Sequence, residues 1–283
     1  HRVLETGDPS GILRNCTALN NLPGDLVYIG GTYISATDPA NLLLSPIVSV
    51  WGYAHGPYAG RNKRFGNANT LFAKEGAQAP GPWGTYSNLR TVKKLFGLTQ
   101  KMFVPKMNAY FEYTDKAAGI GNLHLVVPMF TTDETLLCRA EAYILSGNLD
   151  AGVQDLNYWL KTHSITYQPK TREDLVNFYS NINYMPTVPE SMNERTIKKS
   201  LNPVGFTVAD GDQENLIQCV LHLRRVETVH EGLRWLDIKR YGIEISHNRD
   251  GETTDILTKD DPRRAWQLPQ DVISAGVTAN PRK

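Results

Sequence analysis

The sequence has no long hydrophobic run, few cysteines and almost no excess of charge. No apolar segment approaches the roughly 20 residues that a membrane-spanning helix needs, so we expect none. The net charge of +1 argues against nucleic acid or an anionic membrane as a partner, because both attract strongly basic surfaces. The three cysteines (Cys16, Cys138 and Cys219) are far apart and form no CxxC pattern, which predicts neither a disulfide framework nor a cysteine metal site.

The signatures of common enzyme classes are also missing. There is no G-x-S-x-G, HExxH, P-loop or dinucleotide-binding motif. The seven histidines show no metal-ligand spacing, and the acidic turns at 250–252 and 260–261 lack the pattern of a calcium loop. We therefore expect a protein that is not an enzyme and that holds no cofactor or metal. Counting acids does not exclude a glycosidase, which needs only two carboxylates flanking one bond.

Residues 1–130 are rich in glycine, proline, asparagine and aromatic residues, and they show little helical periodicity. The stretches 45–72 and 75–89 are typical. Loops this long in a compact domain are functional or disordered in most cases, and the content of Trp and Tyr argues against disorder. We interpret this region as long loops held together by buried aromatic side chains.

Residues 131–162 carry the clearest helical pattern. Thr131 and Glu134 form a capping-box signature, apolar residues then repeat at helical spacing, and Gly147 suits the end of the first of two helices. The pattern resembles one tetratricopeptide unit and predicts a helical hairpin. One such unit cannot bury both of its faces, so its partners lie outside this chain or in irregular structure.

A charged segment, RRVETVHEGLRWLDIKRYG (224–242), follows the polar and proline-punctuated residues 163–212. Its pattern predicts one helix, beginning near Gln213, with an apolar arc opposite a charged arc. Gly232 then lies in mid-helix, where it costs about 1 kcal/mol relative to alanine. The charged arc is expected to be a ladder of ion pairs at i,i+3 and i,i+4 spacing, made by Arg224, Glu227, Glu231 and Arg234.

Three segments, in this order, resemble the C-terminal half of the SusD/RagB family of nutrient-binding outer-membrane lipoproteins. The first, TLLCRAEAYILSGNLDAGVQDLN (135–157), is similar to the family's L-x-R-A-E-A-Y…G-N…A…D-L-N pattern. The second is the charged segment, similar to R-R-x-E-L…E-G-x-R-W-x-D-L-x-R-x-G, with Thr228 in place of the leucine. The third, LPQDVISAGVTANPR (268–282), is similar to the I-P…N-P tail, with Asp271 where glutamate is common.

The resemblance implies a mainly α-helical, SusD-like fold, in which tetratricopeptide-type hairpins pack with a loop-rich region and little β structure. On this interpretation residues 1–283 are the C-terminal part of a single domain. The loop-rich ligand region is 1–130, the hairpin is 131–162, and the signature helix and tail are 213–283. The partner helices of the hairpin are expected in an N-terminal portion that precedes this chain.

The resemblance also implies a function in polysaccharide utilization. Members of the family capture glycans, or in some cases peptides, at the outward face of the outer membrane of Bacteroidetes-type bacteria. They deliver the nutrient to a SusC-like TonB-dependent barrel. Attachment to the membrane is expected through an N-terminal lipid anchor that is not in this chain.

The loops before residue 90 supply the side chains that a carbohydrate site needs. Sugar rings stack on Trp and Tyr, while a few polar groups bind their hydroxyls. Family members place aromatic residues of this region in their site. We therefore expect an oligosaccharide or peptide ligand to be bound by Trp51, Tyr53, Tyr58, Trp83, Tyr86, Arg61 and Asn88, with Asn62, Asn67 and Asn69 nearby.

Trp51 and Trp83 are the leading candidates within this set. We expect Trp83→Ala to weaken oligosaccharide binding and to leave the melting temperature nearly unchanged. The remaining tryptophans, Trp159, Trp235 and Trp266, lie in the scaffold segments and are expected in the core.

We interpret the charged segment as a scaffold and not as a ligand site. Its predicted structural network orients the tail and the hairpin, including Arg139 and Glu141, and consists of Arg225, Glu227, Glu231, Arg234 and Asp237. Two other functions remain open at this stage. One is a tetratricopeptide-type scaffold that binds a protein, and the other is a loop-rich glycoside hydrolase.

Overall fold

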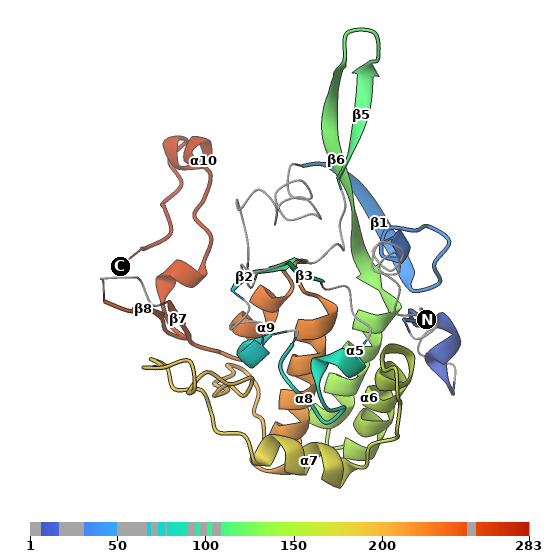
Figure 1. Ribbon diagram of the computed structural model, residues 1–283. Coiled ribbons are helices and arrows are strands. Elements are labelled where there is room, and N and C mark those ends of the chain that lie inside the picture. The colour runs from blue at the N-terminus through green and yellow to red at the C-terminus, as the bar shows by residue number, and fades with distance from the viewer. Residues whose placement is uncertain are drawn as a thin grey trace.

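Figure 1 shows the computed structural model of the chain. The structure describes residues 7–16, 31–49, 67–68, 73–76, 78–89, 94–96, 101–103, 109–247 and 253–282. Within these ranges, side chains are described except at residues 67–68, 86, 94–96 and 101–103.

Four helices form the body of the molecule. Over the predicted hairpin, the structure has α5 (Thr132–Leu145) and α6 (Leu149–His163), joined through Gly147 at φ 86°. The side chain of Thr131 caps α5 by accepting a hydrogen bond from Glu134 N–H (3.2 Å). α8 (Asp212–Glu227) packs against α5, and α7 (Arg172–Ser180) packs against α8 (Figure 1). Helices of this chain therefore cover the hairpin, where the sequence predicted partners outside the chain or irregular structure.

The core lies between these helices. α5 and α6 approach closely because Gly152 has no side chain: a Cβ there would lie 2.5 Å from Ile144 Cγ1. Apolar helix residues with at most 1% exposure fill this core: Leu136, Leu137, Ala140, Ile144, Leu156, Trp159, Leu160, Leu175, Tyr179, Leu216, Ile217, Cys219, Val220, Leu223 and Val226. Among the described residues, no helix combines the length and the apolar character needed to span a membrane.

A three-stranded antiparallel sheet runs upward from the helices in Figure 1. Its order is β1-β6-β5, with β1 (Asn41–Val48), β5 (Ala109–Asp115) and β6 (Ile120–Thr131). β6 continues into α5, so it ties the sheet to the helical body. The prediction of a mainly α fold with little β structure was therefore wrong, and the chain has a mixed α and β fold.

The physical reason lies in the local sequence of β5 and β6. AYFEYTD and IGNLHLVVPMFT are rich in the aromatic and β-branched residues that favour strands. The turn between them is closed by Asp115, whose carboxylate accepts hydrogen bonds from Ala117 N–H (2.9 Å) and Ala118 N–H (3.0 Å). Gly119 supplies the positive φ (68°) that the turn requires. These signals are local, and they mark a hairpin within the region interpreted as loops.

Smaller elements complete the structure. A second sheet has the order β2-β4-β3, with β2 (Asn67–Ala68), β3 (Lys94–Phe96) and β4 (Lys101–Phe103). β7 (Ile245–His247) pairs with β8 (Asp255–Leu257) beyond the helices. The remaining helical elements are short: η1 (Pro9–Ile12), η2 (Tyr86–Asn88), α9 (Arg234–Arg240), η4 (Pro262–Arg264) and α10 (Gln270–Ser274).

The charged segment is not one continuous helix. α8 ends at Glu227, and α9 starts only at Arg234. The intervening turn contains His230 at φ 69° and Gly232 at φ 82°, values that no α-helix accommodates. Gly232 is therefore a turn residue and not a mid-helix glycine. The break changes the direction of the chain, so the ladder of ion pairs predicted along one helix face does not form as such.

The C-terminal tail lies along the outside of the molecule (Figure 1). Trp266 is 82% exposed, so its predicted place in the core was wrong. Trp159, in contrast, is fully buried, and Trp235 is partly buried. The tail is held by polar contacts, among them Asn280 Nδ2 donating to Trp266 O (2.6 Å). The nearby helix α10 likewise has no buried residue.

Candidate functional site

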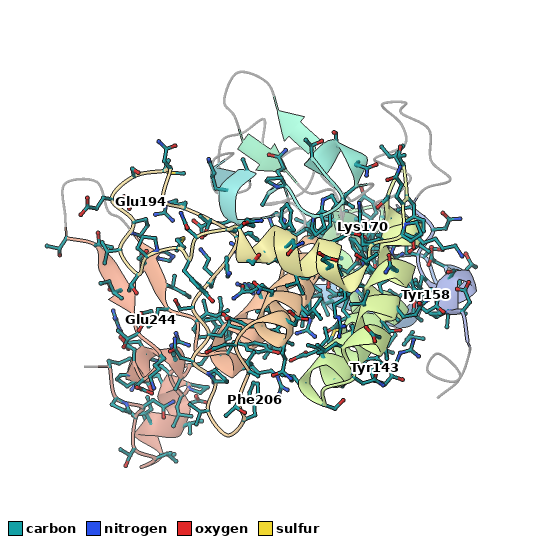
Figure 2. All side chains as sticks on the ribbon, turned by 90° about the horizontal axis from the view of Figure 1, so that it is seen from below. Tyr143, Tyr158, Lys170, Glu194, Phe206 and Glu244 are labelled. Carbon is teal, nitrogen blue, oxygen red and sulfur yellow. The ribbon has the colours of Figure 1, made fainter. Side chains whose placement is uncertain are left out.

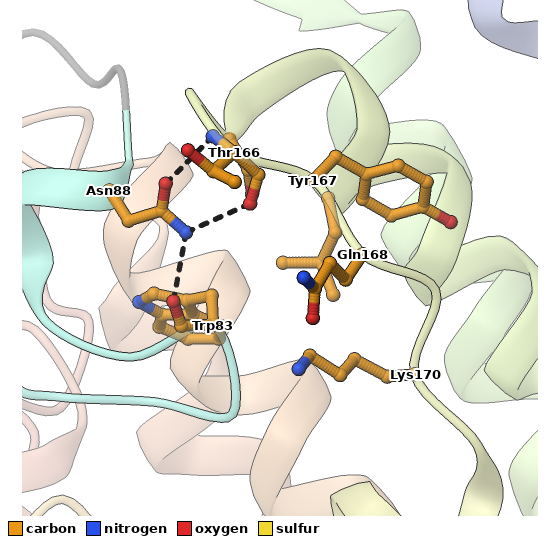
Figure 3. A pocket seen from close by; sticks show the side chains of 8 residues that line it. Trp83, Asn88, Thr166, Tyr167, Gln168 and Lys170 are labelled. Atoms are coloured by element: carbon orange, nitrogen blue, oxygen red, sulfur yellow. Dashed lines mark hydrogen bonds between the residues drawn. The ribbon is translucent and has the colours of Figure 1, made fainter.

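A pocket of about 220 Å³ lies where the loop 78–89 meets the chain that leaves α6. Leu89 and Ser164 form a backbone bridge that joins the two segments. Figure 3 shows the pocket with side chains from both. Its lining combines one indole, one phenol, one leucine and five polar side chains: Trp83, Tyr167, Leu160, Asn88, Ser164, Thr166, Gln168 and Lys170.

The backbone of a tight turn positions Trp83. Gly81 and Gly84 exchange hydrogen bonds, with Gly81 N–H donating to Gly84 O (2.9 Å) and Gly84 N–H donating to Gly81 O (2.8 Å). The indole folds back over Gly81, where an added Cβ would lie 2.3 Å from Trp83 Cζ2. The G-P-W-G sequence is therefore what lets the ring lie here, since only glycine leaves room beneath it.

The Trp83 ring belongs largely to the core. Its centroid lies 4.8 Å from that of His222 on α8, and the residue is only 6% exposed. Its Nε1–H is buried and donates no hydrogen bond within the described part of the chain. Trp83 therefore offers the pocket an edge and not an open stacking face.

Asn88 joins the two walls of the pocket. Its Nδ2 donates to Trp83 O (2.9 Å) and to Thr166 O (3.2 Å), and its Oδ1 accepts from Thr166 N–H (2.9 Å) (Figure 3). These bonds use both donors of the amide and one of its acceptor positions. Asn88 thus holds the pocket in shape, and its donors are not free for a ligand.

Gln168 and Lys170 supply the free polar groups of the pocket. Their side chains point toward Trp83 in Figure 3, and neither side chain has a hydrogen bond to the described residues. Asn157 fixes the backbone beneath them, with Nδ2 donating to Lys170 O (2.8 Å) and Oδ1 accepting from Lys170 N–H (2.8 Å). Figure 2 shows Lys170 beside the start of α7, on the other side of the molecule from Glu194 and Glu244. A fixed backbone carrying free donors suits recognition of hydroxyl groups.

The structure describes only part of the predicted ligand set. Trp83 and Asn88 are brought together in this pocket, whereas Trp51, Tyr53, Tyr58 and Arg61 lie outside the described residues, as do Asn62 and Asn69. The side chains of Tyr86 and Asn67 are likewise not described. Sequence reasoning missed Gln168 and Lys170, because nothing in the polar stretch 163–212 marks them beyond their hydrogen-bonding capacity.

A larger hollow of about 360 Å³ lies between α5 and α9. Its ionic side chains largely bind one another. Arg224 donates from Nη2 to Glu141 Oε2 (2.7 Å) and from Nη1 to Asp237 Oδ1 (2.6 Å). Glu141 Oε1 also accepts from Arg240 Nε (2.9 Å) and from Tyr241 OH (2.5 Å). The ionic contacts make this hollow part of the scaffold, and the Trp83 pocket is the candidate ligand site.

The predicted structural network does not form a single cluster. Asp237 belongs with Arg224, and Arg234 Nη1 lies 3.6 Å from Asp237 Oδ2. Arg225 has no hydrogen bond or ion pair to the described residues. The remaining two members are separate: Glu231 N–H donates to Thr228 O (3.0 Å) within the turn, and Glu227 lies in a second cluster. Of the hairpin residues that were expected to join, Glu141 does, whereas Arg139 pairs with Asp155 (2.6 Å).

We define the second group as the Glu227 cluster, which ties the N-terminal segments to α6. Glu227 accepts hydrogen bonds from Tyr33 OH (3.3 Å) and Trp159 Nε1 (3.3 Å), and its Oε2 lies 3.2 Å from His163 Nε2. Burial lowers the pKa of His163, but Cys16 and Glu227 outweigh it and hold the pKa well above 6.5. His163 is therefore a buried cation that Glu227 compensates.

Asp133 gives the Glu227 cluster a pH dependence. Its Oδ1 accepts from Arg14 N–H (3.1 Å), and burial, followed by the charge of Glu227, raises the pKa of Asp133 to about 6. This pKa exceeds the value of 3.8 for an unfolded chain. Between about pH 4 and pH 6 the carboxyl group of Asp133 is therefore protonated in the folded state and ionised in the unfolded state. The contribution of Asp133 to the free energy of unfolding is therefore fully present at low pH and is lost as pH rises through about 6.

We expect Asp133→Asn, which stays neutral, to gain stability relative to the wild type as pH rises. The gain should be about 2 kcal/mol larger at about pH 7.5 than at about pH 4.5. Urea denaturation at the two pH values measures it. Asp150→Asn removes an 82% exposed carboxylate and serves as the control. If the free energies of unfolding of Asp133→Asn and the wild type differ by the same amount at both pH values, the pKa of Asp133 is not raised in the folded state.

Among the described residues, no three His, Cys, Asp or Glu side chains gather in a way that would hold a metal ion. Comparison of the chain with protein-family models, with curated proteins and with solved structures finds no match.

Proposed function

We propose that this chain is the C-terminal part of a SusD/RagB-like protein that binds nutrient oligosaccharides and passes them to a SusC-like TonB-dependent barrel. One observation carries the proposal: residues of the first two resembling segments bind each other. Glu141, from the A-E-A-Y motif, accepts hydrogen bonds from Arg224, Arg240 and Tyr241 of the charged segment. The two sequence patterns are thus parts of one structural unit, which supports reading them together.

The chemistry of the Trp83 pocket supports a sugar ligand. The pocket pairs an apolar edge with amide and ammonium donors, the combination that binds the C–H and hydroxyl groups of a sugar ring. Its volume suits a single ring and not a folded partner. None of its lining residues is acidic, whereas glycoside hydrolysis requires two carboxylates around the bond. We therefore propose binding without cleavage at this pocket.

A calorimetric screen of neutral oligosaccharides tests the binding role. We expect Gln168→Ala and Lys170→Met each to weaken binding about fivefold, which corresponds to the loss of one hydrogen bond of about 1 kcal/mol. Lys239→Met, a change on the exposed face of α9, is the matched control. If both pocket variants bind oligosaccharides as tightly as the wild type does, this pocket is not the ligand site.

The same screen separates the two alternatives. Binding of peptides, with no response to any oligosaccharide, would favour a tetratricopeptide-type scaffold that recognises protein. Release of shorter sugars on prolonged incubation, detected by chromatography, would favour a glycoside hydrolase.

We further propose an outward-facing, lipid-anchored location at the outer membrane, with the anchor in a segment that precedes this chain. Metabolic labelling of the full-length protein with a fatty acid tests the anchor. Copurification with a TonB-dependent barrel tests the partner. A full-length protein that takes up no label and stays in the soluble fraction would contradict this part of the proposal.

A further inference from the structure

A third group of charged residues, which we call the Glu75 cluster, shares no residue with the lining of the Trp83 pocket. Arg195 Nη1 lies 2.8 Å from Glu75 Oε1, and Lys199 Nζ lies 2.5 Å from Glu75 Oε2. Glu75 and Lys199 are each only 6% exposed. Burial raises the pKa of Glu75, but Lys199 and Arg195 outweigh it and hold the pKa below 4.5. One buried carboxylate therefore already has two cationic partners.

Two more cations come from the charged segment. Gln218 on α8 binds the backbone of Lys199, accepting from its N–H (3.3 Å) and donating to its carbonyl (2.6 Å). Arg225 lies seven residues further along α8, which places it on the same face of the helix. Arg234 stands at the start of α9. Burial lowers the pKa of Lys199, the charge of Glu75 raises it, and the charges of Arg225 and Arg234 lower it further, so that the pKa is about 7.

Among the described residues, the cations of this group outnumber the carboxylates that pair with them. Arg225 is partly buried, yet its guanidinium has no hydrogen bond or ion pair to the described residues. Arg234 Nη1 is buried and lies 3.6 Å from Asp237 Oδ2, which is an ion pair but longer than a hydrogen bond, and Asp237 is shared with Arg224 at 2.6 Å. Leaving guanidinium donors unsatisfied in a partly buried site is unfavourable, so such groups call for a bound partner.

We propose that Arg225, Arg234 and Lys199 form a binding site for an oxyanion: the carboxylate, phosphate or sulfate group of a ligand. The planar fork of an arginine matches such groups with two parallel hydrogen bonds, and a lysine adds a point charge. Glu75 and Arg195 hold Lys199 in place. The site is independent of the proposed oligosaccharide pocket, although both adjoin the face of α8 that carries His222 and Arg225.

Thermal unfolding in different anions tests the site. At matched ionic strength, phosphate, sulfate or glucuronate is expected to raise the melting temperature saturably by about 3 °C over chloride. Comparison of the three anions identifies whether a phosphoryl, sulfuryl or carboxylate group is preferred. Arg225→Gln is expected to abolish the rise. It is also expected to keep or increase the melting temperature in chloride, because it removes one of several like charges.

Arg172→Gln, at a 46% exposed site on α7, is the control and should retain the full response. A response that persists in Arg225→Gln would mean an adventitious ion only. A fall in the melting temperature of Arg225→Gln in chloride would mean that the arginine is already paired within the protein. Either result overturns the proposal.

The pH dependence of anion binding gives a second readout. The charged groups around Lys199 are Glu75, with which it pairs, Arg195, which shares Glu75, and Arg225 and Arg234, whose charges act on it from α8 and α9. With a pKa of about 7, Lys199 is charged at pH 6 and neutral at pH 8. We therefore expect glucuronate or sulfate, whose own charges do not change in this range, to bind about tenfold more tightly at about pH 6 than at about pH 8. Lys199→Met should remove this difference, and an unchanged pH profile in that variant would exclude Lys199 from the site.

Discussion

Replacing Arg224 by methionine is expected to lower the free energy of unfolding by about 3–5 kcal/mol, because two buried carboxylates lose their shared cation. Arg224 lies 2.7 Å from Glu141 and 2.6 Å from Asp237, and all three side chains are at most 8% exposed. Methionine keeps the aliphatic stem of arginine but not its charge, so the loss reports the ionic contacts more than the packing. Denaturant titration followed by circular dichroism measures it.

Arg240→Met is the matched control. It removes a second cation from Glu141 (2.9 Å), but this arginine is 52% exposed. Solvent screens an exposed pair, so the expected loss is about 1 kcal/mol or less. Similar small losses in both variants would show that the contact between α5, α8 and α9 does not depend on the buried pair. They would also remove Glu141 as the link between the two resembling segments.

Local sequence patterns predicted the helical hairpin but not the course of the charged segment. Apolar spacing and Thr131 mark α5, since both act within a few residues. The break after Glu227 was missed because the periodicity continues through the turn. Gly232 was the available signal: a glycine that weakens a helix also permits the positive φ that ends one.

The sheet shows a different kind of error. The strands β5 and β6 carry aromatic and β-branched residues around a Gly-containing turn, which is sufficient to predict a hairpin. The loop prediction for residues 1–130 was based on the glycines and prolines elsewhere in this region. The pairing of β6 with β1, about 80 positions earlier in the sequence, could not be predicted, since no local pattern reports a long-range register.

The candidate site was predictable only in part, for a related reason. Trp83 stands out in sequence because glycines and a proline surround it. Gln168 and Lys170 become site residues only through tertiary contacts, in which Asn88 binds Thr166 and Asn157 binds the backbone of Lys170. Asn88 was predicted to bind the ligand, yet the contacts it makes hold the two walls together. Trp83 and Asn88 of the predicted set do line the pocket, and their role in binding a ligand stays a prediction.

Trp83→Ala is expected to lower the free energy of unfolding by about 3–5 kcal/mol, the range for removing a large buried aromatic side chain. The sequence alone predicted a nearly unchanged melting temperature, on the assumption of an exposed stacking platform. At 6% exposure, with its ring against His222, Trp83 packs in the hydrophobic core instead. Thermal and urea unfolding measure the loss. Weaker ligand binding in this variant would therefore not distinguish a lost contact from a disturbed fold.

A pair of further variants separates the packing of Trp83 from its polar group. Trp266→Ala truncates an 82% exposed tryptophan and should change stability by less than about 0.5 kcal/mol. Trp83→Phe keeps an aromatic ring in the core and removes a buried N–H that has no acceptor among the described residues. Because an unsatisfied buried donor costs about 1–3 kcal/mol, its removal should offset most of the volume that phenylalanine leaves empty. If Trp83→Phe lowers the free energy of unfolding as much as Trp83→Ala does, Nε1 donates to an acceptor. A ligand or a water molecule in the Trp83 pocket would then be the expected acceptor.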